Sequence, residues 1–166
     1  MSLDWIRNIV FFIVLLLVQV LVLNHIHLFE YATPLLYVYF AMPIRRHQPR
    51  WLTLLWCFAM GMSVDIFSDT PGVAAASMTV VGLLQPYLLP LFIQQDYADD
   101  FRPSLRTLGP MKYTFYTFVL VLVHCLLFFS LEAFNFFNWQ QWLASVVGSM
   151  LLTIVLILVV DNFRRK

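Results

Sequence analysis

The feature that most constrains this fold is the alternation of long apolar runs with short basic segments. The apolar runs cover residues 5–23, 29–44, 51–67, 71–93, 113–131 and 139–160. A helix needs roughly 20 residues to cross about 30 Å of hydrocarbon. If all six runs cross a membrane, the ten Lys and Arg residues fall on one side of it. Short loops rich in Lys and Arg stay cytoplasmic, so the pattern predicts six transmembrane helices with both termini inside.

Composition supports a membrane protein. Hydrophobic residues make up 61% of the 166 residues and charged residues 11%, whereas a soluble domain has about 25% charged residues. The apolar surface therefore needs lipid to cover it. We predict an all-α, polytopic membrane bundle that forms a single domain over residues 1–166. The sequence has no polybasic tail that would favour nucleic acid as a partner.

The basic residues that anchor this topology lie in one turn and at the C-terminus. The turn after the second apolar run contains Arg45, Arg46 and Arg50, and the chain ends with Arg164, Arg165 and Lys166. We predict that all of them lie at the cytoplasmic face. The polar stretch 94–111 is predicted to be a cytoplasmic loop.

The second run, 29–44, is the weakest candidate for a crossing. It begins near Glu30, contains Pro34 and ends at Pro43. We predict a short second crossing that is partly re-entrant. The alternative is a hairpin that returns to its own side, but this would place the following arginines outside, which the charge rule disfavours.

The segment between the third and fourth runs is the main candidate site. Gly61 and Asp65 are four residues apart and share a helix face. Asp69 or Thr70 can cap the next helix, and Pro71 suits its first position. With Gly61, the small residues Gly72 and Ala76 leave room for close approach of another helix.

Two roles are possible for Asp65. An acid within apolar sequence is costly and should face protein or water, so Asp65 could organise a polar contact inside the bundle or with a partner helix. Alternatively, it accepts hydrogen bonds at a frayed helix end near Ser68 and Asp69. The residue chemistry alone leaves both open.

Other polar residues in the apolar runs favour packing. Gln19 is expected to hydrogen-bond across helices. For His124 and Cys125, packing or one local hydrogen bond is favoured over a metal or proton pathway. The small residues Ala144, Ser145, Gly148 and Ser149 of the sixth run favour packing within the monomer, with a partner helix as the alternative.

The Gly61-x-x-x-Asp65 element, followed by Pro71-Gly72 and small residues, resembles the rod shape-determining MreD family. The chain length, the basic inner loops and the basic C-terminus agree with this family over nearly the whole sequence. The resemblance implies a non-enzymatic partner of MreC in the complex that directs lateral peptidoglycan synthesis. It also implies proximity to actin-like MreB, to a polymerase of the shape, elongation, division and sporulation (SEDS) class and to a penicillin-binding transpeptidase in the bacterial inner membrane.

A second function stays open at this point. The MreD fold is similar to the substrate-binding subunits (S-components) of energy-coupling-factor transporters, so a vitamin-type binding subunit is the alternative. We find no Ser/His/Asp order, phosphate loop or paired intramembrane acids, and we predict no enzyme activity, metal or cofactor. A lipid bound within the bundle is compatible with the sequence.

Overall fold

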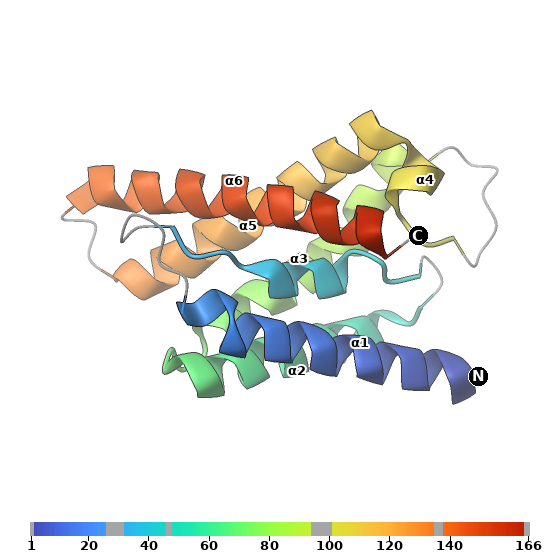
Figure 1. The fold of residues 1–166 in the computed structure, drawn as a ribbon, viewed down its shortest axis with the longest axis horizontal. Helices are drawn as coiled ribbons and strands as arrows, with labels where there is room; N and C mark the ends of the chain where they lie inside the picture. Colours follow the sequence, from blue (N-terminus) through green and yellow to red (C-terminus); the bar gives the residue numbers. More distant parts are fainter. Residues whose placement is uncertain (1, 26–31, 46–47, 94–100, 135–137, 165–166) are drawn as a thin grey trace.

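The computed structural model describes residues 2–25, 32–45, 48–93, 101–134 and 138–164. Within these ranges, long helices form an elongated bundle (Figure 1). They are α1 (Ser2–Leu21), α2 (Arg50–Ser68), α3 (Val73–Phe92), α5 (Pro110–Ala133) and α6 (Trp139–Phe163). The short helices are η1 (Leu23–His25), η2 (Leu36–Ala41) and α4 (Leu105–Leu108).

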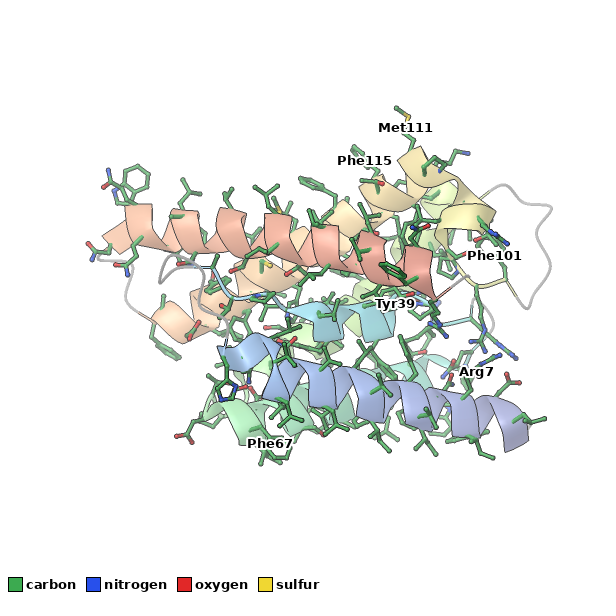
Figure 2. All side chains as sticks on the ribbon, viewed as in Figure 1. Arg7, Tyr39, Phe67, Phe101, Met111 and Phe115 are labelled. Atoms are coloured by element: carbon green, nitrogen blue, oxygen red, sulfur yellow. The ribbon has the colours of Figure 1, made fainter. Side chains whose placement is uncertain are left out.

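The five long helices are long and apolar enough to cross a membrane. They correspond to the apolar runs 5–23, 51–67, 71–93, 113–131 and 139–160. Many of their large apolar side chains point away from the bundle, as Phe67, Met111 and Phe115 do in Figure 2. These three residues are 62%, 85% and 61% exposed, which is the arrangement expected of surfaces that face lipid. The described part of the chain is thus helical, with five helices that can span a membrane.

The predicted helix over 29–44 is wrong. Residues 29–31 lie outside the described ranges, and residues 32–35 are not helical. The only helical part of 32–45 is η2, a short 3₁₀ helix. The cause is in the sequence: Pro34 and Pro43 lack the amide hydrogens that a continuous helix needs, and each disfavours helical backbone in the residue before it.

This central segment, residues 32–45, runs through the middle of the bundle (Figure 1). Its beginning contacts the C-terminal part of α1, where Gln19 Nε2 donates to the Pro34 carbonyl at 3.0 Å. Its end contacts the start of α1, where Arg45 binds Asp4 at 2.8 Å. The segment is therefore antiparallel to α1 and passes from one end of the bundle to the other.

Protein surrounds the central segment on all sides. Every residue from Leu35 to Met42 is buried, and η2 packs against α1, α2, α3 and α6. Helix α6 satisfies part of its backbone: the Thr33 amide donates to Ser149 Oγ at 3.1 Å, and the Leu35 amide donates to Thr153 Oγ1 at 3.0 Å. Non-helical backbone is tolerated at membrane depth only where protein or water satisfies it, and these contacts meet part of that requirement.

The bundle has two distinct ends (Figure 1). The hairpin end contains the turn between α2 and α3, residues 69–72. The arginine end, defined by Arg7, Arg45, Arg102 and Arg164, contains the start of α1 and the last turn of α6.

Candidate functional site

Asp65 fastens the end of α2 to the beginning of α3. It is buried, with 4% of its surface exposed. Its Oδ1 accepts the Ala74 amide at 2.8 Å, and its Oδ2 accepts the Ala75 amide at 2.9 Å. The Thr70 hydroxyl donates to Oδ1 at 3.0 Å. The carboxylate thus satisfies two of the amides that a helix leaves open at its N-terminus, where negative charge is also favoured.

Of the two possible roles of Asp65, the structure shows the polar contact inside the bundle. The acid acts as the capping group of a neighbouring helix, which the sequence alone did not reveal. The amides that it binds lie nine and ten residues later in the chain, so no local capping pattern signals them.

Asp69 and Thr70 do not cap α3, so that prediction is wrong. Asp69 is the C-cap of α2, with a φ of 58°, and its amide donates to the Asp65 carbonyl. Gly72 is the N-cap of α3 with a φ of 84°, a conformation that glycine adopts readily. The helix begins after Gly72, so Pro71 is not its first residue. The carboxylate of Asp65 occupies the amides that an N-cap side chain would bind.

Gly61 allows the closest approach between α2 and α3. A Cβ atom at this position would lie 2.5 Å from both the Ala74 carbonyl oxygen and the Ala75 Cα. Those are backbone atoms of α3, so only glycine fits. Ala76, in contrast, is exposed on the outer surface, so it takes no part in this contact. A Cβ at Gly72 would meet nothing within 4 Å, so Gly72 serves the turn rather than the packing.

The other polar residues in the apolar runs mostly bind the central segment. Gln19 bonds to this segment rather than to a helix, and it also donates to Asn24 at 3.0 Å. His124 Nε2 lies 2.9 Å from the Tyr37 hydroxyl, which confirms the local hydrogen bond expected of His124. A Cβ at Gly148 would lie 3.2 Å from the Ala32 Cβ, so this part of α6 packs within the monomer.

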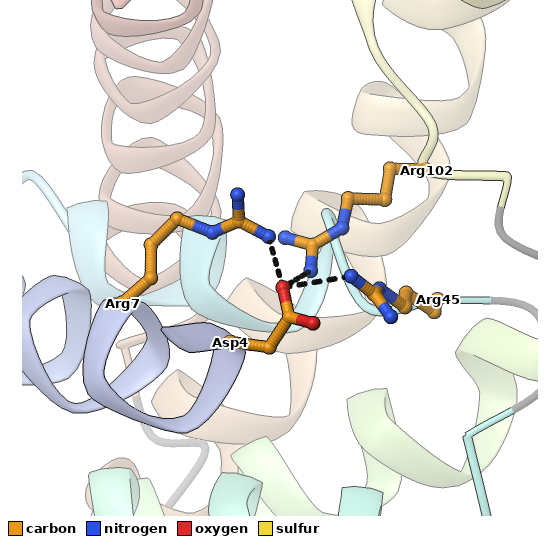
Figure 3. A network of polar contacts seen from close by, with 4 residues as sticks. All are labelled: Asp4, Arg7, Arg45 and Arg102. Carbon is orange, nitrogen blue, oxygen red and sulfur yellow. Dashed lines mark hydrogen bonds and ion pairs between the residues drawn. The ribbon is translucent and has the colours of Figure 1, made fainter. Parts of the chain in front are cut away.

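The arginine end holds a charge cluster that the sequence analysis did not identify (Figure 3). Asp4 Oδ1 binds Arg7 at 2.7 Å, Arg45 at 2.8 Å and Arg102 at 3.5 Å. The Arg164 guanidinium lies 4.4 Å from the centre of the Phe11 ring. Only the i, i+3 spacing of Asp4 and Arg7 is visible in the sequence, because the other arginines come from distant segments.

Two neighbouring hollows open at the arginine end, and Pro43, Arg102 and Arg164 line both. The larger has a volume of about 420 Å³. Its remaining lining residues are Tyr39, Phe101, Pro103, Ser104, Thr107 and Asp161. The narrower hollow is lined in addition by Asn8, Phe11, Phe40, Ile44, Gln48 and Trp56. Arg102 and Arg164 therefore lie between a hollow with polar lining residues and one with aromatic lining residues.

Asp161 links three parts of the chain beside the larger hollow. Its Oδ1 accepts the Tyr39 hydroxyl at 2.7 Å, and its Oδ2 accepts the Leu105 amide at 3.2 Å. Asp161 belongs to the last turns of α6, Tyr39 to the central segment and Leu105 to α4. This contact holds the loop that carries Arg102 against the bundle.

The predicted topology anchors fall in different surroundings. Arg45 and Arg164 belong to the arginine end, and Arg50 is exposed, with its Nη1 donating to the Tyr87 hydroxyl at 3.0 Å. Arg46, Arg165 and Lys166 lie outside the described residues. Most of the 94–111 loop is described from residue 101 onward; it contains α4, and α5 begins at Pro110, earlier than predicted.

Among the described residues, no three His, Cys, Asp or Glu side chains converge as metal ligands. Comparisons with protein-family models, with curated proteins and with solved structures gave no significant match to this chain.

Proposed function

We propose that this chain is a non-enzymatic scaffold of the cell-shape and elongation complex in the bacterial cytoplasmic membrane. In this role it binds MreC and helps to position lateral peptidoglycan synthesis. The observation that carries the proposal is that the residues of the MreD-like pattern meet in one contact. Gly61 and Asp65 both pack on the first turn of α3, directly after Pro71 and Gly72.

The proposed orientation places the arginine end in the cytoplasm and the hairpin end outside. The described basic residues support it, because they belong to the start of α1, the end of the central segment, the start of α2, the loop with α4, the start of α5 and the end of α6, which lie toward the arginine end (Figure 1). They are Arg7, Arg45, Arg50, Arg102, Arg106, Lys112 and Arg164. Cytoplasmic loops carry the excess of Lys and Arg in membrane proteins. The central segment then supplies the sixth crossing.

The outer face of the α2–α3 hairpin is the surface that we assign to the membrane helix of MreC. Asp65 is enclosed, so it fixes the shape of the hairpin rather than touching the partner. Ala76 is exposed on α3, and Met62 and Ile66 are 41% and 72% exposed on α2. An exposed small residue on a membrane helix allows a second helix to approach closely.

The test is an affinity pull-down of the full-length chain from gently solubilised membranes. Recovery of MreC, with MreB, the SEDS polymerase and the transpeptidase, is the expected result. Ala76→Trp should reduce MreC recovery by blocking close approach. Leu151→Trp, on the exposed face of α6, is the matched control and should leave recovery unchanged. Purification of the chain without any of these partner proteins would contradict the proposal.

The second candidate function is a substrate-binding subunit of a vitamin-type transporter. The central segment is the observation that favours it, because transporters form binding sites at interrupted membrane segments. The larger hollow, however, lies at the arginine end, whereas such a subunit takes its ligand from the outside. A vitamin-like ligand retained at near-equal stoichiometry, seen by mass spectrometry, together with co-purifying ATPases, would favour transport.

A further inference from the structure

A chain of side-chain amides joins three elements at the hairpin end. Gln19 of α1 is fully buried. Its Nε2 donates to the Pro34 carbonyl and to Asn24 Oδ1, each at 3.0 Å. Asn24, in η1, donates through its Nδ2 to Ser68 Oγ at 2.6 Å. Because Pro34 belongs to the central segment and Ser68 is the last residue of α2, these bonds connect the end of α1, the start of the central segment and the end of α2.

The Pro34 carbonyl fixes the direction of every bond in this chain of amides. A carbonyl oxygen can only accept a hydrogen bond, so Gln19 must present its NH2 group to Pro34. The second hydrogen of that NH2 group goes to Asn24 Oδ1. Asn24 must then present its own NH2 group to Ser68. Reversing either amide would place two donors or two acceptors together, so the three bonds depend on one another.

The bond between Asn24 and Ser68 is a tertiary contact that holds the end of α2. The two residues are 44 positions apart, and Ser68 lies beside Asp69, the C-cap of α2. Asp65 fastens the same end of the helix to α3. The last turn of α2 is therefore held from α3 and from η1. Hydrogen bonds in a chain strengthen their neighbours, so loss of the Ser68 bond should weaken those of Gln19.

The other end of the amide chain holds the start of the central segment. Gln19 binds the Pro34 carbonyl, and the next residue, Leu35, donates its amide to Thr153 Oγ1 of α6. From there the central segment runs to the arginine end, where Arg45 binds Asp4. A displacement of the end of α2 thus has a hydrogen-bonded connection to a segment that runs the length of the bundle.

We propose that Gln19 and Asn24 are positioning residues that couple the end of α2 to the start of the central segment, so that the two open and close as one unit. Ile66, two residues before Ser68, belongs to the exposed surface assigned to MreC, so docking there would reach the central segment through the amide chain. That consequence rests on the proposed function. The coupling itself does not, so a failed MreC pull-down would leave it unaffected.

Hydrogen–deuterium exchange of the full chain in nanodiscs tests the coupling. Peptides from residues 32–42 report on the central segment, and peptides from residues 64–72 report on the end of α2. Ser68→Ala removes one acceptor from the end of α2 and should speed exchange roughly three- to fivefold in both sets of peptides. Asn24→Leu breaks the amide chain at its centre and should speed exchange in both sets at least as much. The double variant should add nothing to Asn24→Leu, because both residues belong to the same bond.

Ser63→Ala is the matched control, because it makes the same change in the same helix. Ser63 Oγ donates to the Ala59 carbonyl within α2, so exchange in both sets of peptides should stay at the wild-type rate. Faster exchange at the end of α2 alone in Ser68→Ala would overturn the proposal, because the central segment would then open independently.

Unchanged exchange in both sets of peptides in Ser68→Ala would overturn the proposal as well. Equal effects of Ser63→Ala and Ser68→Ala would also overturn it. If Asn24→Leu unfolds, Ser68→Ala alone decides the question, since it removes a single half-buried hydroxyl at the end of a helix.

Discussion

At the scale of single residues, two residues of α2 determine how the hairpin is built. Asp65 supplies the negative charge that the start of α3 needs, and Gly61 supplies the space. Both were identified from their spacing in the sequence. Their partners were not predictable, because the amides of Ala74 and Ala75 become neighbours of Asp65 only after α3 has folded back on α2.

Asp65→Asn should destabilise the protein. The asparagine side chain has one acceptor oxygen and one NH2 group, which is a donor. One of the backbone amides of Ala74 and Ala75 would then face this NH2 group and lose its acceptor. We expect a loss of about 1–3 kcal/mol. Thermal unfolding in a mild detergent measures it. Asp69→Asn changes the same chemistry at an exposed position and should have little effect. Equal losses in both variants would contradict the capping role of Asp65.

Gly61→Ala should also destabilise the hairpin, because the added Cβ would meet α3 backbone atoms at 2.5 Å and the helices must separate. Overpacking of this kind costs about 1–3 kcal/mol. Gly148→Ala is the control, since its Cβ would lie 3.2 Å from one side-chain atom, and its cost should be smaller. The same unfolding assay compares them. A smaller loss for Gly61→Ala would show that the two helices are not held this closely.

At the scale of elements, the sequence predicts the long helices well and the central segment poorly. The length and mean hydropathy of an apolar run are sufficient to predict a helix that faces lipid. The central segment is buried on all sides, so its residues are apolar without any periodicity that distinguishes helix from extended chain. Pro34 and Pro43 were the residues in the sequence that indicated an interrupted helix. The hydroxyls that satisfy its backbone come from α6, more than a hundred residues later.

Thr153→Val tests how the central segment is held. Thr153 Oγ1 accepts the buried Leu35 amide, and valine removes this acceptor at nearly the same volume. An unsatisfied buried amide costs about 1–3 kcal/mol, so the unfolding temperature should fall and the Leu35 amide should exchange faster with deuterium.

Thr79→Val is the matched control for this change. Its hydroxyl donates only to the Ala75 carbonyl within its own helix, so the loss should be small. Slow exchange at Leu35 in Thr153→Val would contradict the assigned role of α6.

At the scale of the whole molecule, the fold brings distant charges together at one end. Arg7, Arg45, Arg102 and Arg164 come from α1, the central segment, a loop and α6. Their convergence could not be predicted from the sequence, because no spacing rule connects basic residues in distant segments. Their convergence gives the arginine end a chemistry that the individual residues do not have, and the same convergence supports the orientation proposed for the bundle.

The number of crossings is the central claim, since the central segment decides whether both ends of the chain share one side of the membrane. Single cysteines at Leu3, Asp69 and Phe163, all exposed, are labelled in intact cells with a membrane-impermeant maleimide. The native Cys57 and Cys125 are buried and should not react. We predict labelling of Asp69→Cys alone, with Leu3→Cys and Phe163→Cys reacting only after permeabilisation. Labelling of Leu3→Cys and Phe163→Cys from opposite sides would contradict the account.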